Sequence, residues 1–176
     1  MHEENTEGIH HLAARVGGAL KDHGLVLATA ESCTGGWVAQ AITSVAGSSR
    51  WFERGFVTYS NRAKQEMLGV LAATLEAHGA VSEEVVREMA LGALAHSAAQ
   101  VSVAITGIAG PEGGTPDKPV GMVWLAWART NGAVDCRVRH YTGDRRHIRQ
   151  QAVMDGLHGV LDIVAERHES GSRASG

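Results

Sequence analysis

Short apolar runs that alternate with segments of helical periodicity constrain the fold of this chain most. The runs LVLAT (25–29), GFVTYS (55–60), VSVAIT (101–106) and MVWLAWA (122–128) have the length and composition of strands. A helical pattern of apolar residues precedes the first run and stops at Gly24. This alternation predicts an α/β fold in which helices cover both faces of a mixed sheet.

The remaining segments predict further helices and one edge strand. Helices are expected near Thr34, over RAKQEML (62–68) with Asn61 as a possible cap, and after Ser82, where two acidic residues follow the cap. In the segment AVDCRVRHY (133–141) apolar and polar residues alternate with period two, which is typical of an antiparallel or edge strand with one solvent-exposed face. A long final helix is expected after TGD (142–144).

The composition bounds the chain to one globular domain. Its 176 residues are 44% hydrophobic and 20% charged, which is enough apolar material to build a core without disulfide bonds. Residues 1–8 and 168–176 are polar or small and have no apolar face, so we expect both to be disordered. Residues 9–167 are expected to form the single domain.

Charge, hydropathy and cysteine content indicate a small-molecule partner. The formal net charge of −3, with scattered Lys and Arg, argues against a nucleic-acid surface. No apolar run approaches the roughly 20 residues of a membrane span.

Cys33 and Cys136 are expected to be free thiols in a reducing cytoplasm. The ten His residues are dispersed and have no helical ligand spacing, so no metal site is expected.

Three unusual segments follow predicted strands. They are ESCTGG (31–36), SNRAK (60–64) and GIAGPEGGTP (107–116). In α/β sheets the loops at the carboxyl ends of the strands carry the ligand, so we expect these segments to meet at one site. The third segment continues to residue 121 and contains all three prolines of the chain, but it has no P-loop or GxGxxG pattern and is weak evidence by itself.

The ESCTGG segment has two interpretations. Ser32 or Thr34 could be a plain N-cap, or Ser32 could be a nucleophile beside backbone N–H groups that stabilise an oxyanion. Gly35 and Gly36 would permit a substrate to approach the backbone closely.

A serine nucleophile needs a base. Lys64 is the better candidate, because a position in the first turn of a helix disfavours its charged form. It could equally be a solvated helix charge, in which case His140 or His147 would have to supply the base.

Together the motifs ESCTGG, YSNRAK, ITGIAGPEGGTPDKPVG and GDR resemble the CinA C-terminal domain family over roughly residues 9–165. The resemblance implies a three-layer α/β/α sandwich with a mixed, mainly parallel sheet, and a homodimer or larger homo-oligomer. It also implies metal-free and cofactor-free hydrolysis of nicotinamide mononucleotide to nicotinic acid mononucleotide and ammonia. Larger members have an additional N-terminal domain, and here we expect a stand-alone amidase domain.

The resemblance assigns roles to particular residues. Ser32 is the implied nucleophile, with Lys64 as its base, and backbone N–H groups of 33–36 or 106–110 are expected to hold the oxyanion. Arg145 of GDR is expected to bind the nucleotide phosphate. The other residues expected to bind or orient substrate are Thr34, Gly35, Gly36, Tyr59, Asn61, Thr106, Gly107, Ala109 and Gly110.

Two other functions remain open from the sequence. One is a non-catalytic module that binds a pyridine nucleotide or a protein partner in a competence-related role. The other is a phosphatase or phosphotransferase that uses the glycine-rich loop, although no acidic metal-binding cluster accompanies that loop.

Overall fold

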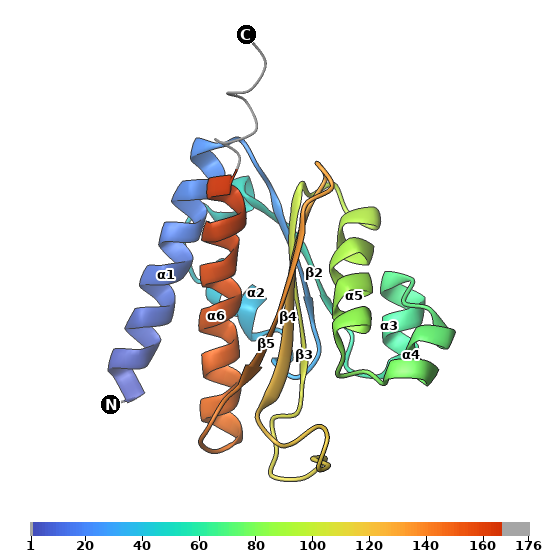
Figure 1. Cartoon of the computed structure of the whole chain (residues 1–176). Coiled ribbons are helices and arrows are strands. Elements are labelled where there is room, and N and C mark those ends of the chain that lie inside the picture. Colours follow the sequence, from blue (N-terminus) through green and yellow to red (C-terminus); the bar gives the residue numbers. More distant parts are fainter. Residues whose placement is uncertain (1, 167–176) are drawn as a thin grey trace, which may run out of the picture.

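Five strands form one mixed sheet at the centre of the computed structural model, which describes residues 2–166 (Figure 1). The strand order is β2-β1-β3-β4-β5. Strand β1 pairs in parallel with both β2 and β3, and β4 pairs antiparallel with both β3 and β5. The mixed sheet and its antiparallel edge strand confirm the sequence-based expectation. The strands are β1 (Leu27–Glu31), β2 (Phe52–Val57), β3 (Val101–Gly107), β4 (Met122–Arg129) and β5 (Val134–His140).

Helices cover both faces of this sheet (Figure 1). One layer contains α1 (His2–Asp22), α2 (Trp37–Thr43) and α6 (Arg145–Ala165). The other contains α3 (Asn61–Leu68), α4 (Ala72–His78) and α5 (Glu83–Ala95), and a short 3-10 helix, η1 (Ser48–Arg50), precedes β2. The three-layer arrangement is the predicted one. The domain boundary expected at residue 9 falls inside α1, and the tail expected at 168–176 lies outside the described residues.

The two faces of the sheet have cores of different character. On the α6 side the strands present large apolar side chains such as Ile105, Leu125 and Trp127. On the α5 side the neighbouring positions are small, including Ala104 and Ala126. Because successive residues of a strand point to opposite faces, this alternation fixes which face each helix covers.

Helix α6 packs closely against the sheet because it has glycine where it meets Trp127. A Cβ atom at Gly159 would lie 2.0 Å from the ring of Trp127, a distance that no real contact allows. The Trp127 indole N–H donates a hydrogen bond of 2.8 Å to the carbonyl oxygen of Gly156. This contact holds the helix that carries Arg145 in a fixed position against β4.

Several element boundaries differ from those expected. Strand β1 runs two residues further than LVLAT, so Glu31 belongs to the strand, and β2 ends at Val57 rather than at Ser60. The cap of α3 is Ser60, whose hydroxyl accepts from Ala63 N–H, and Asn61 is its first helical residue. Helix α4 was not expected.

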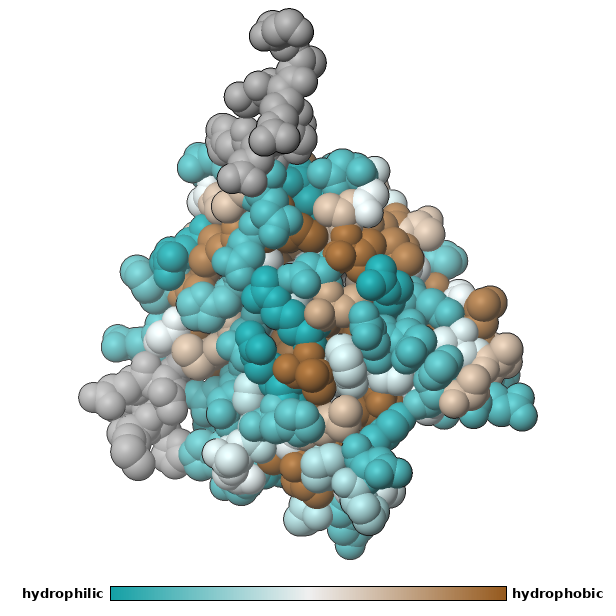
Figure 2. Space-filling view, in the orientation of Figure 1, coloured by the Kyte–Doolittle hydropathy of each residue, from teal (hydrophilic) through white to brown (hydrophobic). Residues whose placement is uncertain are grey.

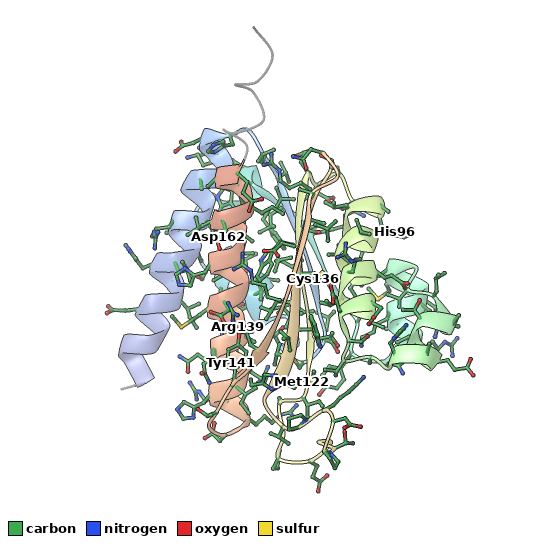
Figure 3. All side chains as sticks on the ribbon, in the orientation of Figure 1. His96, Met122, Cys136, Arg139, Tyr141 and Asp162 are labelled. Carbon is green, nitrogen blue, oxygen red and sulfur yellow. The ribbon has the colours of Figure 1, made fainter. Side chains whose placement is uncertain are left out.

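The face of the molecule drawn in Figure 2 is mostly polar, with separate apolar patches. No helix within residues 2–166 has the length and apolar character that a membrane crossing requires. Cys33 is buried, Cys136 lies on β5 (Figure 3), and both are free thiols, as expected.

Candidate active site

Ser32 lies in the turn that joins β1 to α2. Its backbone N–H donates to the carbonyl oxygen of Ile105 at 3.0 Å, which ties the turn to the end of β3. Gly35 and Gly36 have φ angles of 59° and 98°, so the turn uses left-handed backbone that glycine adopts without strain. The sequence therefore places the Ser32 side chain at the carboxyl edge of the parallel strands.

Lys64 reaches Ser32 from the opposite layer. Its side chain extends from α3 into the protein and is only 1% exposed. The Nζ atom lies 3.0 Å from Ser32 Oγ and 2.9 Å from the carbonyl oxygen of Thr58. The alternative in which Lys64 is a solvated helix charge is therefore wrong.

The surroundings of Lys64 favour its neutral amine. Burial is the main reason that its pKa lies below the ordinary value of 10.5, and a negative charge on Cys33 would oppose the shift. An ammonium has three N–H donors, whereas the described residues offer acceptors only at Ser32 and Thr58. No carboxylate in the described part of the chain forms an ion pair with Lys64. A neutral amine can instead accept the proton of the Ser32 hydroxyl.

Cys33 is adjacent to Ser32 but is kept as a thiol. Burial raises its pKa to about 12, and the nearby Glu31 carboxylate adds to the rise. Only the thiolate is a strong nucleophile, so at neutral pH this environment disfavours Cys33 as the attacking group.

Glu31 organises the turn from inside the sheet. Its carboxylate accepts hydrogen bonds from Val38 N–H at 2.8 Å, Ala39 N–H at 3.1 Å and the Thr34 hydroxyl at 2.7 Å. Burial raises the pKa of Glu31, and these hydrogen bonds oppose the rise. The cap residue of α2 is Gly36, so the alternative in which Ser32 or Thr34 caps the helix by its side chain is wrong.

Arg145 joins two of the predicted loops. Its Nη1 donates to the carbonyl oxygen of Gly110 at 2.8 Å, and its Nη2 donates to the Tyr59 hydroxyl at 3.1 Å. Tyr59 is 62% exposed, and both partners of the guanidinium are uncharged. The positive charge of Arg145 is thus available to an anionic ligand beside the site.

The other predicted residues support the surrounding backbone. Thr106 is buried and donates to the carbonyl oxygen of Ala80, so its hydroxyl connects β3 to the layer of α5. A Cβ atom at Gly107 would lie 2.9 Å from the Met122 carbonyl oxygen, so close strand packing requires glycine there. Ala109 is buried, and Asn61 is exposed at the first position of α3.

The histidines considered as alternative bases have other neighbours. His147 Nδ1 lies 2.8 Å from Asp144 Oδ1 at the start of α6, and His140 pairs with Met122 at the end of β5. Within residues 2–166 no group of three or more His, Cys, Asp or Glu side chains could hold a metal ion.

Sequence reasoning missed Glu31 and Arg149 as parts of the site. Glu31 lies inside ESCTGG, and an acidic residue just before a helix start is a usable signal. Arg149 donates to the carbonyl oxygens of Cys33 and Thr34, which are 116 and 115 residues away in sequence. No local pattern could have indicated that contact.

The sequence matches a known family along most of its length. The CinA C-terminal domain family matches residues 9–164, and the chain belongs to this family. This chain is similar to the crystal structure of the competence/damage inducible protein CihA from Agrobacterium tumefaciens, with a TM-score of 0.86 and 47% sequence identity between the two chains. That alignment covers 88% of this chain and 94% of that one.

Curated relatives of similar length have a named activity. Nicotinamide-nucleotide amidohydrolase PncC of Escherichia coli strain K12 is 58% identical, over 83% of this chain and 88% of the relative. The protein of the same name in Enterobacter agglomerans is 53% identical, over 87% of this chain and 93% of its own length. A CinA-like protein of Akkermansia muciniphila is 54% identical, and there the match covers 34% of a longer chain.

Proposed function

We propose that this protein is a nicotinamide-nucleotide amidohydrolase that converts nicotinamide mononucleotide to nicotinic acid mononucleotide and ammonia. The curated relatives at 53% and 58% identity bear that activity in their names. The observation that carries the chemistry is the buried Lys64 amine 3.0 Å from the Ser32 hydroxyl. This pair supplies a nucleophile and a base without further groups.

Acylation begins when neutral Lys64 takes the proton of Ser32 and Ser32 Oγ bonds to the carboxamide carbon. The carbonyl oxygen becomes an oxyanion in the tetrahedral intermediate. When the C–N bond breaks, Lys64 returns a proton to the leaving nitrogen, which departs as ammonia. The product of this half-reaction is an ester between Ser32 and the nicotinoyl group of the nucleotide.

Deacylation uses the same base. Lys64 takes a proton from water, whose oxygen attacks the ester carbon. The bond to Ser32 Oγ then breaks, and Lys64 returns the proton to that oxygen. The nucleotide product forms as a carboxylic acid, which loses its proton to solvent and leaves as a carboxylate, and the dyad regains its initial protonation.

The turn after β1 offers candidate oxyanion donors. The N–H groups of Ser32 and Gly35 are already donated to Ile105 and Ser32 carbonyl oxygens. The N–H groups of Cys33 and Thr34 make no such bond to a carbonyl oxygen of the described residues. The Thr34 N–H is therefore available to a negatively charged oxygen next to Ser32, whereas the Cys33 N–H also interacts with the Cys33 sulfur.

An ammonia-release assay on nicotinamide mononucleotide tests the proposal. We expect turnover by the wild type in the presence of EDTA, and none by Ser32→Ala. Acid quenching during turnover should trap the acylated Ser32, which peptide mass spectrometry identifies. If the protein binds the nucleotide but releases no ammonia, it is a binding module, and the proposed activity is wrong.

A further inference from the structure

We propose that Arg149 is a positioning residue that fixes the peptide plane between Cys33 and Thr34 and so aims the Thr34 N–H at the oxyanion. The inference rests on the proposed function, because the oxyanion arises in acyl transfer to Ser32. It extends that function by assigning a role to a helix α6 side chain that does not itself touch the reacting atoms.

The Arg149 guanidinium clamps the first two carbonyl groups after Ser32. Its Nε donates to Cys33 O at 3.0 Å, and its Nη2 donates to Thr34 O at 3.1 Å. Its Cζ lies 5.4 Å from the centre of the Trp37 ring. The planar fork and the stacked ring together restrict where these two peptide groups can point.

A peptide group links the carbonyl of one residue to the N–H of the next. In a trans peptide these two groups point in opposite directions, so a donor that fixes Cys33 O also fixes the direction of the Thr34 N–H. Hydrogen bonding of a cation to the carbonyl polarises the same peptide and strengthens its N–H as a donor. The Thr34 N–H makes no bond to a carbonyl oxygen of the described residues, and so remains available to the substrate.

The charge of Arg149 is directed at this turn. No carboxylate among residues 2–166 forms an ion pair with it, and its described hydrogen-bond acceptors are the two carbonyl oxygens. Glu31 holds the following residues of the same segment by accepting from Val38 and Ala39 N–H. The backbone around Ser32 is thus fixed by a cation at its carbonyls and by a carboxylate at its N–H groups.

Steady-state kinetics of Arg149→Lys and Arg149→Met test the assignment. We expect kcat for nicotinamide mononucleotide to fall by roughly 10- to 100-fold in both variants, with KM nearly unchanged, because a displaced oxyanion donor weakens only transition-state binding. Lysine keeps the charge but lacks the planar fork. Arg146→Met, at an exposed arginine of the same helix, is the matched control and should retain the wild-type kcat.

A fluorophosphonate that carries no phosphate group separates this role from the alternatives. It phosphonylates Ser32 with loss of fluoride, and its phosphoryl oxygen occupies the oxyanion position, so its rate of labelling does not depend on the natural substrate. We expect the rate, followed by intact mass, to fall by a similar factor in both Arg149 variants, and thermal unfolding to show that they are folded. Wild-type labelling without amidase activity would reject the proposed substrate, and slower labelling of the Arg149 variants would then still support the oxyanion role of the turn.

Two results would overturn the inference. Folded Arg149 variants that label at the wild-type rate would show that the arginine does not set the oxyanion donors. A raised KM for the mononucleotide, with normal kcat and normal labelling, would show instead that Arg149 binds the phosphate. If Arg149→Met does not fold, the same comparisons are made with Arg149→Lys.

Discussion

Ser32 and Cys33 are adjacent potential nucleophiles whose surroundings give them different chemistry. Ser32 Oγ has a buried amine at hydrogen-bond distance, whereas the Cys33 thiol is held protonated by burial, with its pKa at about 12. The intrinsic reactivity of sulfur therefore matters less here than access to a base.

Substitution of the two residues should rank them clearly. We expect Ser32→Ala to lose nearly all ammonia release, because no other hydroxyl of residues 2–166 forms a hydrogen bond with Lys64. Cys33→Ala should keep substantial activity, since it removes only a buried thiol. Initial rates on nicotinamide mononucleotide measure both, and the opposite ranking would assign the nucleophile to Cys33.

The pH dependence of kcat/KM should report the protonation of Lys64. Burial lowers the pKa of this lysine, and only its neutral form accepts the Ser32 proton, so activity should rise as pH increases through that lowered pKa. Lys64→Arg should be inactive at every pH, because a guanidinium does not deprotonate in this range. An arginine variant with most of the wild-type rate would mean that the base lies elsewhere.

The same burial should make Lys64 a cost to stability. In the unfolded chain the lysine binds a proton up to its ordinary pKa of 10.5, whereas the folded protein releases it at lower pH. Stability should therefore rise with pH between the two pKa values. We expect Lys64→Met to be inactive but more stable than the wild type at pH 7, with a smaller difference as the pH approaches 10.5. Urea unfolding over this pH range measures this, and a less stable variant at pH 7 would contradict it.

At the scale of elements, the start of α2 depends on a strand residue. Glu31 ends β1, and its carboxylate accepts from N–H groups in the first turn of the next helix. The cap residue itself, Gly36, offers no side chain. One buried carboxylate thus couples the end of a strand, the nucleophile turn and a helix.

Glu31→Gln tests this coupling. The amide places a donor where the carboxylate had an acceptor, so one buried N–H loses its partner, and we expect a loss of about 1–3 kcal/mol in the free energy of unfolding. We also expect a lower kcat, because the segment that follows Ser32 loses one of the hydrogen bonds that hold it. Glu76→Gln is an exposed control expected within about 0.5 kcal/mol of the wild type. Equal stability of both variants would remove Glu31 from this role.

Elements with a periodic apolar face or a capping side chain were predicted well from the sequence. Ser82 caps α5 as expected, and the period-two pattern of 133–141 identified the edge strand β5. Helix α4 was missed because its cap position is Leu71, which makes no side-chain hydrogen bond. Motifs predicted Ser32 and Lys64 as a pair, and the structure places their side chains 3.0 Å apart, but the contact of Arg149 with Cys33 depends on the tertiary fold alone.

At the scale of the whole molecule, the site draws on both helical layers and the sheet. Ser32 follows β1, Lys64 comes from α3, and Arg145 comes from α6 and contacts both Tyr59 and Gly110. In Figure 3, Arg139 and Tyr141 lie on the β5 side next to α6, and both contact Asp155 of that helix. These contacts, with the packing of Gly159 on Trp127, hold α6 to the sheet.

Substrate preference should reflect the charge that α6 brings to the site. Among the residues that the structure describes, Arg145 donates only to uncharged groups, so the loss of a substrate phosphate should remove charge-assisted hydrogen bonds of about 1.5–3 kcal/mol. We expect kcat/KM for nicotinamide mononucleotide to exceed that for nicotinamide riboside by roughly 10- to 100-fold. The preference should shrink in Arg145→Met, and equal values for the two substrates would show that the phosphate is not recognised.

The contact between Arg149 and Cys33 also has a consequence for how the chain acquires its activity. It closes a loop of 116 residues and joins a helix near one end of the chain to a turn near the other. Contacts between such distant segments form only after most of the intervening chain has been ordered, since the entropy of closing the loop must first be offset. During refolding from denaturant, helical circular dichroism should therefore recover ahead of amidase activity. Recovery of catalysis therefore reports completion of the fold. A partly folded chain in which α6 is detached has Ser32 and Lys64 but lacks Arg149, which orients the turn after Ser32.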